Sequence, residues 1–189
     1  MRLFVAVRLA EPVVDAALAV AGRIQKSLGP QIKARWAPAE NMHVTVRFIG
    51  DVTDDGVARV LDALRPPLAI VPFDVVLGSC GVFPPSGPPR VVWIGLASGQ
   101  ASLQAMHLEL NRRLAPLGYE PEPRQFAAHL TLARLKDVER GAGRALRETV
   151  AGVAPLVREC RVTGATVFQS HLSSKGSTYE ALLDIPCIG

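Results

Sequence analysis

The hydrophobic residues of the chain recur with two spacings, one typical of strands and one typical of helices. Strand patterns occur at 2–8, 34–36, 43–49, 72–83, 91–96, 129–135, 158–169 and 178–185. Apolar residues three and four positions apart predict helices at 11–28, 54–65, 100–116 and 138–151. Gly29-Pro30 and Pro66-Pro67 are expected to end the first two helices, and the polar stretch 170–177 to form a loop. The pattern predicts a mixed α+β fold.

The order strand, helix, strand, helix, strand occurs twice, on either side of a turn-rich segment at 84–90. In the first copy 41 residues separate Arg2 from His43, and in the second 38 separate Val91 from His129. This near match in position indicates an internal duplication. We therefore expect residues 1–189 to form a single domain of two closely packed lobes, related by a pseudo-two-fold axis.

Each copy carries the pattern H-x-T-x on a predicted strand, as "HVTV" at 43–46 and "HLTL" at 129–132. Successive side chains on a strand point to opposite faces, so each histidine shares a face with its threonine, and the apolar residues take the other face. If the two lobes meet across a groove, that groove holds two imidazoles and two hydroxyls. A neutral imidazole can take a proton while a charged one gives a proton, and threonine hydroxyls can donate hydrogen bonds to phosphate oxygens.

Other site chemistries lack their sequence marks. Two histidines could bind zinc, but threonine is a poor ligand, and no third Cys, His or acidic residue stands at ligand spacing. The GxSxG motif of many serine hydrolases is absent. The pattern therefore favours acid–base chemistry without a metal or another cofactor.

The composition indicates the general class of protein. The chain is 49% hydrophobic and 20% charged, which is typical of a globular protein, and it has no run of eighteen apolar residues. Its three cysteines are widely spaced and include no CxxC, which predicts a reduced, cytoplasmic protein without a disulfide framework. The net charge of +4 is compatible with a phosphate-bearing partner but only weakly indicates one.

At this point the chain resembles a known family. The paired motifs, together with "RWAPAENMHVTVRFIGDV" at 35–52, "PPRVVWIGL" at 88–96 and "LAPLGYEPEPRQFAAHLTLARLK" at 114–136, are similar to the two-histidine phosphoesterase superfamily. Within it, the chain is similar over almost its full length to RNA 2′,3′-cyclic phosphodiesterases, also called 2′-5′ RNA ligases. That family usually has proline before the second motif, where this chain has Ala128.

The resemblance implies a bilobal fold with antiparallel sheets around a central cleft, and hydrolysis of a ribose 2′,3′-cyclic phosphate to a 2′-phosphomonoester. It implies that His43 is the proton donor to the leaving 3′-oxygen and that His129 is the proton acceptor from water. Thr45 and Thr131 would hold the phosphate, together with Arg134. Strand alternation places Arg134 on the wrong face for this role, so it reaches the cleft only if the strand bulges or twists after Ala133.

Alternation also suggests other candidates. Arg47 shares the parity of His43 and is proposed as a second phosphate contact, whereas Phe48 is expected in the core. Phe4 is either a core residue or a base-stacking platform, and Arg124 is a candidate cleft residue. His107 is expected to have a structural or surface role, and His171 to lie on the surface or at the rim of the groove.

The expected partner is the end of an RNA, or a small nucleotide, with a 2′,3′-cyclic phosphate, bound by a monomer. Two other functions stay open. The same acid–base pair could run in reverse and join a cyclic phosphate to a 5′-hydroxyl, or the groove could bind RNA without turnover. The pseudo-symmetry would also allow the acid and base roles of the two histidines to be exchanged.

Overall fold

The computed structural model describes residues 1–28, 32–136, 138, 140–173 and 176–188. The described residues form the helices α1 (Glu11–Ser27), α2 (Asp54–Leu64), α3 (Gln100–Leu114) and α4 (Arg140–Ala151). Their strands are β1 (Arg2–Arg8), β2 (Lys33–Trp36), β3 (His43–Asp51), β4 (Phe73–Phe83), β5 (Val91–Ser98), β6 (Leu130–Lys136), β7 (Arg158–Val162), β8 (Gly164–Ser173) and β9 (Gly176–Pro186). Short 3-10 turns follow β2 and α3, at Ala39–Asn41 and Ala115–Leu117.

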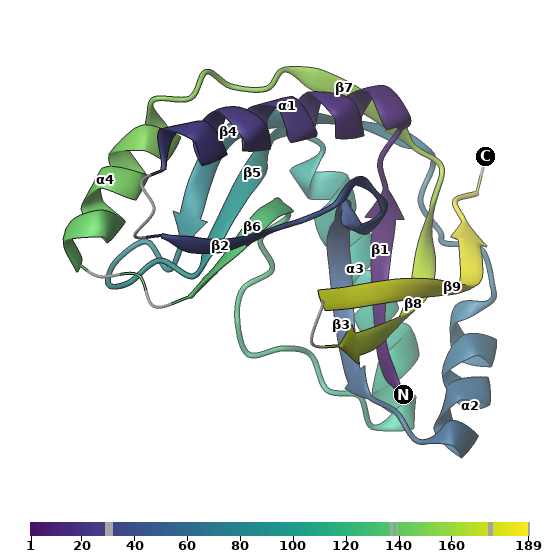
Figure 1. The fold of residues 1–189 in the computed structure, drawn as a ribbon. Coiled ribbons are helices and arrows are strands. Elements are labelled where there is room, and N and C mark those ends of the chain that lie inside the picture. Colours follow the sequence, from purple (N-terminus) through teal and green to yellow (C-terminus); the bar gives the residue numbers. More distant parts are fainter. Residues whose placement is uncertain (29–31, 137, 139, 174–175, 189) are drawn as a thin grey trace.

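All these strands belong to one curled antiparallel sheet, in which equivalent strands of the two copies lie on either side of the centre (Figure 1). The order is β7-β4-β5-β6-β3-β1-β8-β9, and β2 pairs with the outer part of β6. The two motif strands, β3 and β6, are neighbours at the centre and are paired at Val44 and Leu130. On one side of this centre stand β5 and β4, and on the other their counterparts β1 and β8. The predicted α+β antiparallel fold is confirmed.

Each lobe is assembled from both copies of the repeat. In the first copy α1 leaves β1 but packs on β6 and β7, and β4 pairs with β5 of the second copy. In the second copy α3 leaves β5 but packs on β3, and β8 pairs with β1. Figure 1 shows the result: α1 and α4 cover the lobe of β4 to β7, while α2 and α3 cover the lobe of β1, β3, β8 and β9.

Local periodicity predicted most helices and strands with small errors at their ends, but it was wrong in two places. The strand expected at 158–169 is two strands, because the chain pairs with β4 up to Val162 and with β1 from Thr166, on opposite sides of the central strands β6 and β3. Gly164 permits the crossing, since a Cβ there would lie 2.4 Å from the carbonyl oxygen of Ile185. The expected loop at 170–177 is mostly strand, except for residues 174–175, which lie outside the described residues, as do Gly29 and Pro30.

The core anchors the two motif strands. Val44 and Val46 on β3, and Leu130 and Leu132 on β6, are all 0–1% exposed. Burying each of these side chains stabilises the fold by about 1.5–3 kcal/mol. The alternating residues of both motifs are therefore directed away from the core.

Candidate active site

The two histidines lie at equivalent ends of the central strands. His43 is the first residue of β3, and His129 immediately precedes β6. Because Val44 and Leu130 are directly opposite each other, both histidines flank the same cross-strand pair. Thr45 and Thr131 are half-buried and alternate with the core residues, on the faces of their histidines. The structure thus brings all four residues of the two motifs together.

Both motif strands contain a β-bulge at the same position. Along β3 the pairing with β1 passes from Thr45 to Arg47 and leaves Val46 as the extra residue. Along β6 the pairing with β5 passes from Thr131 to Ala133 and leaves Leu132 as the extra residue. Each bulge reverses the alternation of the residues that follow it. The fifth residue after each histidine therefore returns to the face of the histidine.

On β6 that fifth residue is Arg134. Its side chain is exposed and lies on the face of His129, and its positive charge contributes to lowering the pKa of both His43 and His129. The bulge that Arg134 was predicted to need is present, and it lies at Leu132, before Ala133.

The prediction that Arg47 faces the cleft is wrong. The bulge at Val46 turns Arg47 into the protein, where the residue is only 2% exposed. Its guanidinium donates hydrogen bonds to three backbone carbonyls, those of Phe48 at 2.8 Å, Tyr119 at 3.1 Å and Glu120 at 2.6 Å. Arg47 therefore holds the loop that leads from α3 toward His129 against β3.

The structure also decides the places of the two phenylalanines. Phe48, expected in the core, is 46% exposed, because it takes the surface position that alternation assigns to Arg47. Phe4 is 3% exposed and packs against His43, with ring centroids 5.0 Å apart. A nucleobase cannot stack on a ring buried in this way, so Phe4 is a supporting core residue and not a stacking platform.

Aromatic side chains surround each imidazole. The ring of His43 lies 5.2 Å from that of Tyr179 and 6.2 Å from that of Phe168, both on the β8–β9 pair. The ring of His129 lies 5.1 Å from Phe83 and 6.5 Å from Trp93. Gly81 makes room for Trp93, since a Cβ there would lie 2.3 Å from the indole. No sequence signal marked Phe168, Tyr179 or Phe83, because they reach the site from other strands of the sheet.

These aromatic side chains exclude water from the two imidazoles and thereby disfavour the charged imidazolium form. Burial, opposed by a hydrogen bond with the backbone of Asn41, lowers the pKa of His43 from 6.5 to about 4, and the positive charges of Arg134 and His129 contribute further. Burial also lowers the pKa of His129, again against a backbone hydrogen bond and with help from Arg134. Without an anion in the site, both rings are therefore neutral at pH 7.

Backbone hydrogen bonds orient both rings in the same way. Nδ1 of His129 lies 2.7 Å from the carbonyl oxygen of Ala127, two residues earlier, and His43 is bonded to the backbone of Asn41, also two residues earlier. A carbonyl only accepts, so Nδ1 of His129 carries the proton. Its Nε2 is then left with a lone pair that can accept a proton from a substrate or water.

A third histidine supports the site from behind. His107 is buried on α3, donates from Nδ1 to the carbonyl of Val46 at 2.7 Å and accepts at Nε2 from Asn111 at 2.9 Å. Phe126, on the loop before His129, stacks on its ring at 4.6 Å. His107 thus connects the β3 bulge to this loop, which confirms its predicted structural role.

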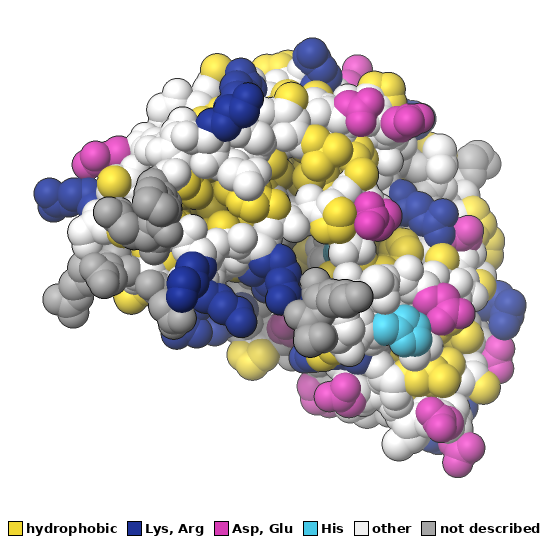
Figure 2. All heavy atoms as spheres, viewed as in Figure 1, with side chains coloured by type: hydrophobic (Ala, Val, Ile, Leu, Met, Phe, Trp, Pro, Cys, Tyr) yellow, Lys and Arg dark blue, Asp and Glu magenta, His cyan; other side chains and the backbone are white. Residues whose placement is uncertain are grey.

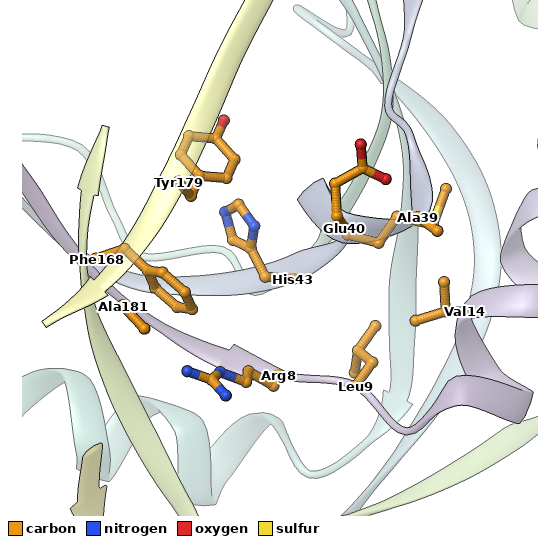
Figure 3. Close-up of a pocket in the computed structure, with 10 residues that line it drawn as sticks. Arg8, Leu9, Val14, Ala39, Glu40, His43, Phe168, Tyr179 and Ala181 are labelled. Atoms are coloured by element: carbon orange, nitrogen blue, oxygen red, sulfur yellow. The ribbon is translucent and has the colours of Figure 1, made fainter. Parts of the chain in front are cut away.

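A pocket of about 360 Å³ opens beside His43 (Figure 3). In the close-up the imidazole stands between Tyr179 and Phe168 on one side and Glu40 on the other. Arg8 also lines the pocket, with its guanidinium 5.4 Å from the Phe168 ring centroid and 3.5 Å from a carboxylate oxygen of Asp184. The pocket has the mixed apolar and polar lining of a small-molecule site.

The remaining candidates lie on the surface. His171 is exposed on β8 and its Nε2 is 3.0 Å from the Glu180 carboxylate. Arg124 is exposed on the loop before His129, and its role stays a prediction. Among the residues the structure describes, no group of three or more His, Cys, Asp or Glu side chains is placed to hold a metal ion. No helix among them is long and apolar enough to cross a membrane.

Comparisons with known proteins agree with this geometry. The model of the LigT-like phosphoesterase family matches the chain twice, over residues 10–93 and 94–179. An RNA 2′,3′-cyclic phosphodiesterase of Archaeoglobus fulgidus is 31% identical over 182 residues, which is 96% of this chain and 98% of that protein. Another, from Aeropyrum pernix, is 33% identical over 154 residues, which is 77% of this chain and 82% of that protein.

Solved structures share the fold over the whole chain. The protein TT0787 of Thermus thermophilus superimposes with a TM-score of 0.78 at 25% identity, over 98% of this chain and 97% of that one. LigT of E. coli, solved with 3′-AMP, superimposes with a TM-score of 0.76 at 23% identity, over 100% of this chain and 98% of that one. With two family matches that together span most of its length, the chain belongs to the LigT-like phosphoesterase family.

Proposed function

We propose that this protein hydrolyses the 2′,3′-cyclic phosphate at the end of an RNA strand and leaves a 2′-phosphomonoester. The observation that carries the proposal is the pair of imidazoles at equivalent positions of the two central strands, with Arg134 on the face of His129. The names of the two relatives support it. A cytoplasmic, monomeric enzyme remains the expectation from sequence.

The proposed reaction needs two proton transfers at opposite sides of phosphorus. Water attacks phosphorus while His129 Nε2 takes its proton, and the bond from phosphorus to the 3′-oxygen breaks as His43 protonates that oxygen. The attacking and leaving oxygens of such a displacement stand roughly in line, so the base and the acid must lie on opposite sides of phosphorus. Here the base is carried at the start of β6 and the acid on β3. Thr45, Thr131 and Arg134 would donate hydrogen bonds to the non-bridging oxygens as charge grows there.

The product of a defined substrate tests this assignment. An oligoribonucleotide that ends in 2′,3′-cyclic phosphate is expected to yield a 2′-phosphate and a free 3′-hydroxyl, identified by phosphorus NMR. A 3′-phosphate would contradict the assigned bond. Split RNA halves with a 5′-hydroxyl test the reverse ligation, which water at high concentration should outcompete. A groove that only binds RNA would leave the cyclic phosphate intact.

The value of kcat/KM is expected to peak below pH 6.5. One imidazole must be charged and the other neutral, so the profile is a bell centred between the two pKa values of the free enzyme, and burial places both below 6.5. In Arg134→Gln, loss of the nearby positive charge should raise both values and move the peak to higher pH. Arg65→Gln, which removes an exposed charge beside α2, should leave the peak in place. A wild-type optimum above pH 6.5 would contradict the pKa shifts.

A further inference from the structure

The pairing of β2 with β6 creates a row of positive charge that leads away from the histidines. Lys33 is paired with Lys136, and Arg35 with Arg134, and all four residues are exposed. We call these four residues the cationic strip. The residues that alternate with them in the two strands include the buried Ala133 and Leu135, so the four charges share the outer face. Figure 2 shows Lys and Arg side chains gathered beside β2, next to the hollow between the lobes.

Such an arrangement is unfavourable for the sheet itself. Like charges directly opposite each other on neighbouring strands are destabilising, and here Lys33 stands directly opposite Lys136. In the described part of the chain, no carboxylate forms an ion pair with Lys33, Arg134 or Lys136. Three exposed cations without an ion-pair partner among the described carboxylates are typical of a surface that receives its negative charge from a bound partner.

The strip starts at the active site and continues beyond it. Arg134, at its inner end, is the arginine that influences both histidines. Lys136, at its outer end, borders a hollow of about 460 Å³ together with Arg90 and Pro89. Residues two apart on a strand are separated by about 7 Å, so the inner and outer pairs could each meet one of two successive phosphates of an extended strand.

The chemistry of the cyclic end determines which phosphates these are. The cyclic phosphate occupies the 2′- and 3′-oxygens of the terminal ribose, so the rest of an RNA can leave only through the 5′-oxygen. We propose that the cationic strip binds the phosphates on the 5′ side of the cyclic end, so that the enzyme acts on RNA strands in preference to cyclic mononucleotides. This inference rests on the proposed function and adds to it the residues that bind the strand beyond its cyclic end.

Comparison of two substrates in two charge-matched variants tests the inference. The double variant Lys33→Gln/Lys136→Gln removes the outer pair and leaves Arg134 untouched. For a hexaribonucleotide with a terminal cyclic phosphate, kcat/KM at low salt is expected to fall about tenfold. The slope of log(kcat/KM) against log[salt] should become shallower by about 0.7, since the outer pair meets one phosphate and each phosphate contact in single strands contributes about 0.7. For 2′,3′-cyclic AMP, which has no 5′ phosphate, kcat/KM should not change.

The control is Arg59→Gln/Arg65→Gln, which removes the same charge from exposed positions at α2. It should leave both substrates unaffected. The inference is overturned if wild-type protein cleaves both substrates equally well at low salt, or if the two double variants behave alike. If neither substrate is cleaved, the proposed function fails. Titration with a hexamer that ends in a 3′-phosphate then still reports whether the strip binds RNA, because only the strip variant should lose affinity.

Discussion

Replacing His129 by alanine is expected to lower kcat for hydrolysis of the cyclic phosphate by about 10²- to 10⁴-fold. Its Nε2 is the group that would take the proton of the attacking water, and Nδ1 is held by the carbonyl of Ala127. No other described side chain stands beside His129 to take over this role, since Phe83 and Trp93 fill the space around the ring. The measurement is single-turnover cleavage of an oligoribonucleotide with a terminal cyclic phosphate.

Replacing His43 by alanine should have a similar effect through loss of the proton donor. Because the two histidines act in one step, the double variant is expected to lose little more than either single variant. His171→Ala is the matched control: this histidine is exposed on β8, pairs with Glu180 and should be replaceable without loss. A His129→Ala protein with a rate close to that of wild type would exclude the proposed acid–base pair. Circular dichroism and urea unfolding of each variant separate lost chemistry from lost structure.

Replacing Arg47 by leucine is expected to cost about 3 kcal/mol of the free energy of unfolding. The buried guanidinium serves three carbonyls, those of Phe48, Tyr119 and Glu120, and leucine would leave all three without their donor. Burial lowers the pKa of this arginine, while the carboxylate of Glu122 acts in the opposite direction. The measurement is urea denaturation, in which the midpoint should fall in proportion.

Arg134, which is exposed and lies five residues after His129, provides the contrast to Arg47, which lies four residues after His43. Arg134→Gln should change activity and leave the free energy of unfolding within about 0.5 kcal/mol, because its side chain is on the surface. Arg47→Leu should change stability first, and activity only as the loop before His129 loosens. If Arg47→Leu were as stable as wild type and instead weakened substrate binding, Arg47 would belong to the cleft after all.

The sequence by itself determined the helices, most of the strands and the two H-x-T-x motifs, because each depends on the spacing of residues close along the chain. Val44 and Leu130 alternate with the motif histidines, and this local pattern was sufficient to place His43 and His129 on strand faces that point away from the core. The similar position of the motif in each copy also indicated the duplication, and the family match in both halves agrees with it.

The tertiary structure alone decided which residues after each motif reach the cleft. A bulge arises from the way in which two strands pair. The sequence of β3 or of β6 alone therefore does not reveal that Val46 or Leu132 is the extra residue. That one feature exchanged the expected places of Arg47 and Phe48. The environment of the imidazoles was equally hidden, because Phe168, Tyr179 and Phe83 come from strands distant in sequence. Desolvation and the pairing of charges across strands depend on all the neighbours of a residue in space. The spacing of residues along the chain does not determine those neighbours.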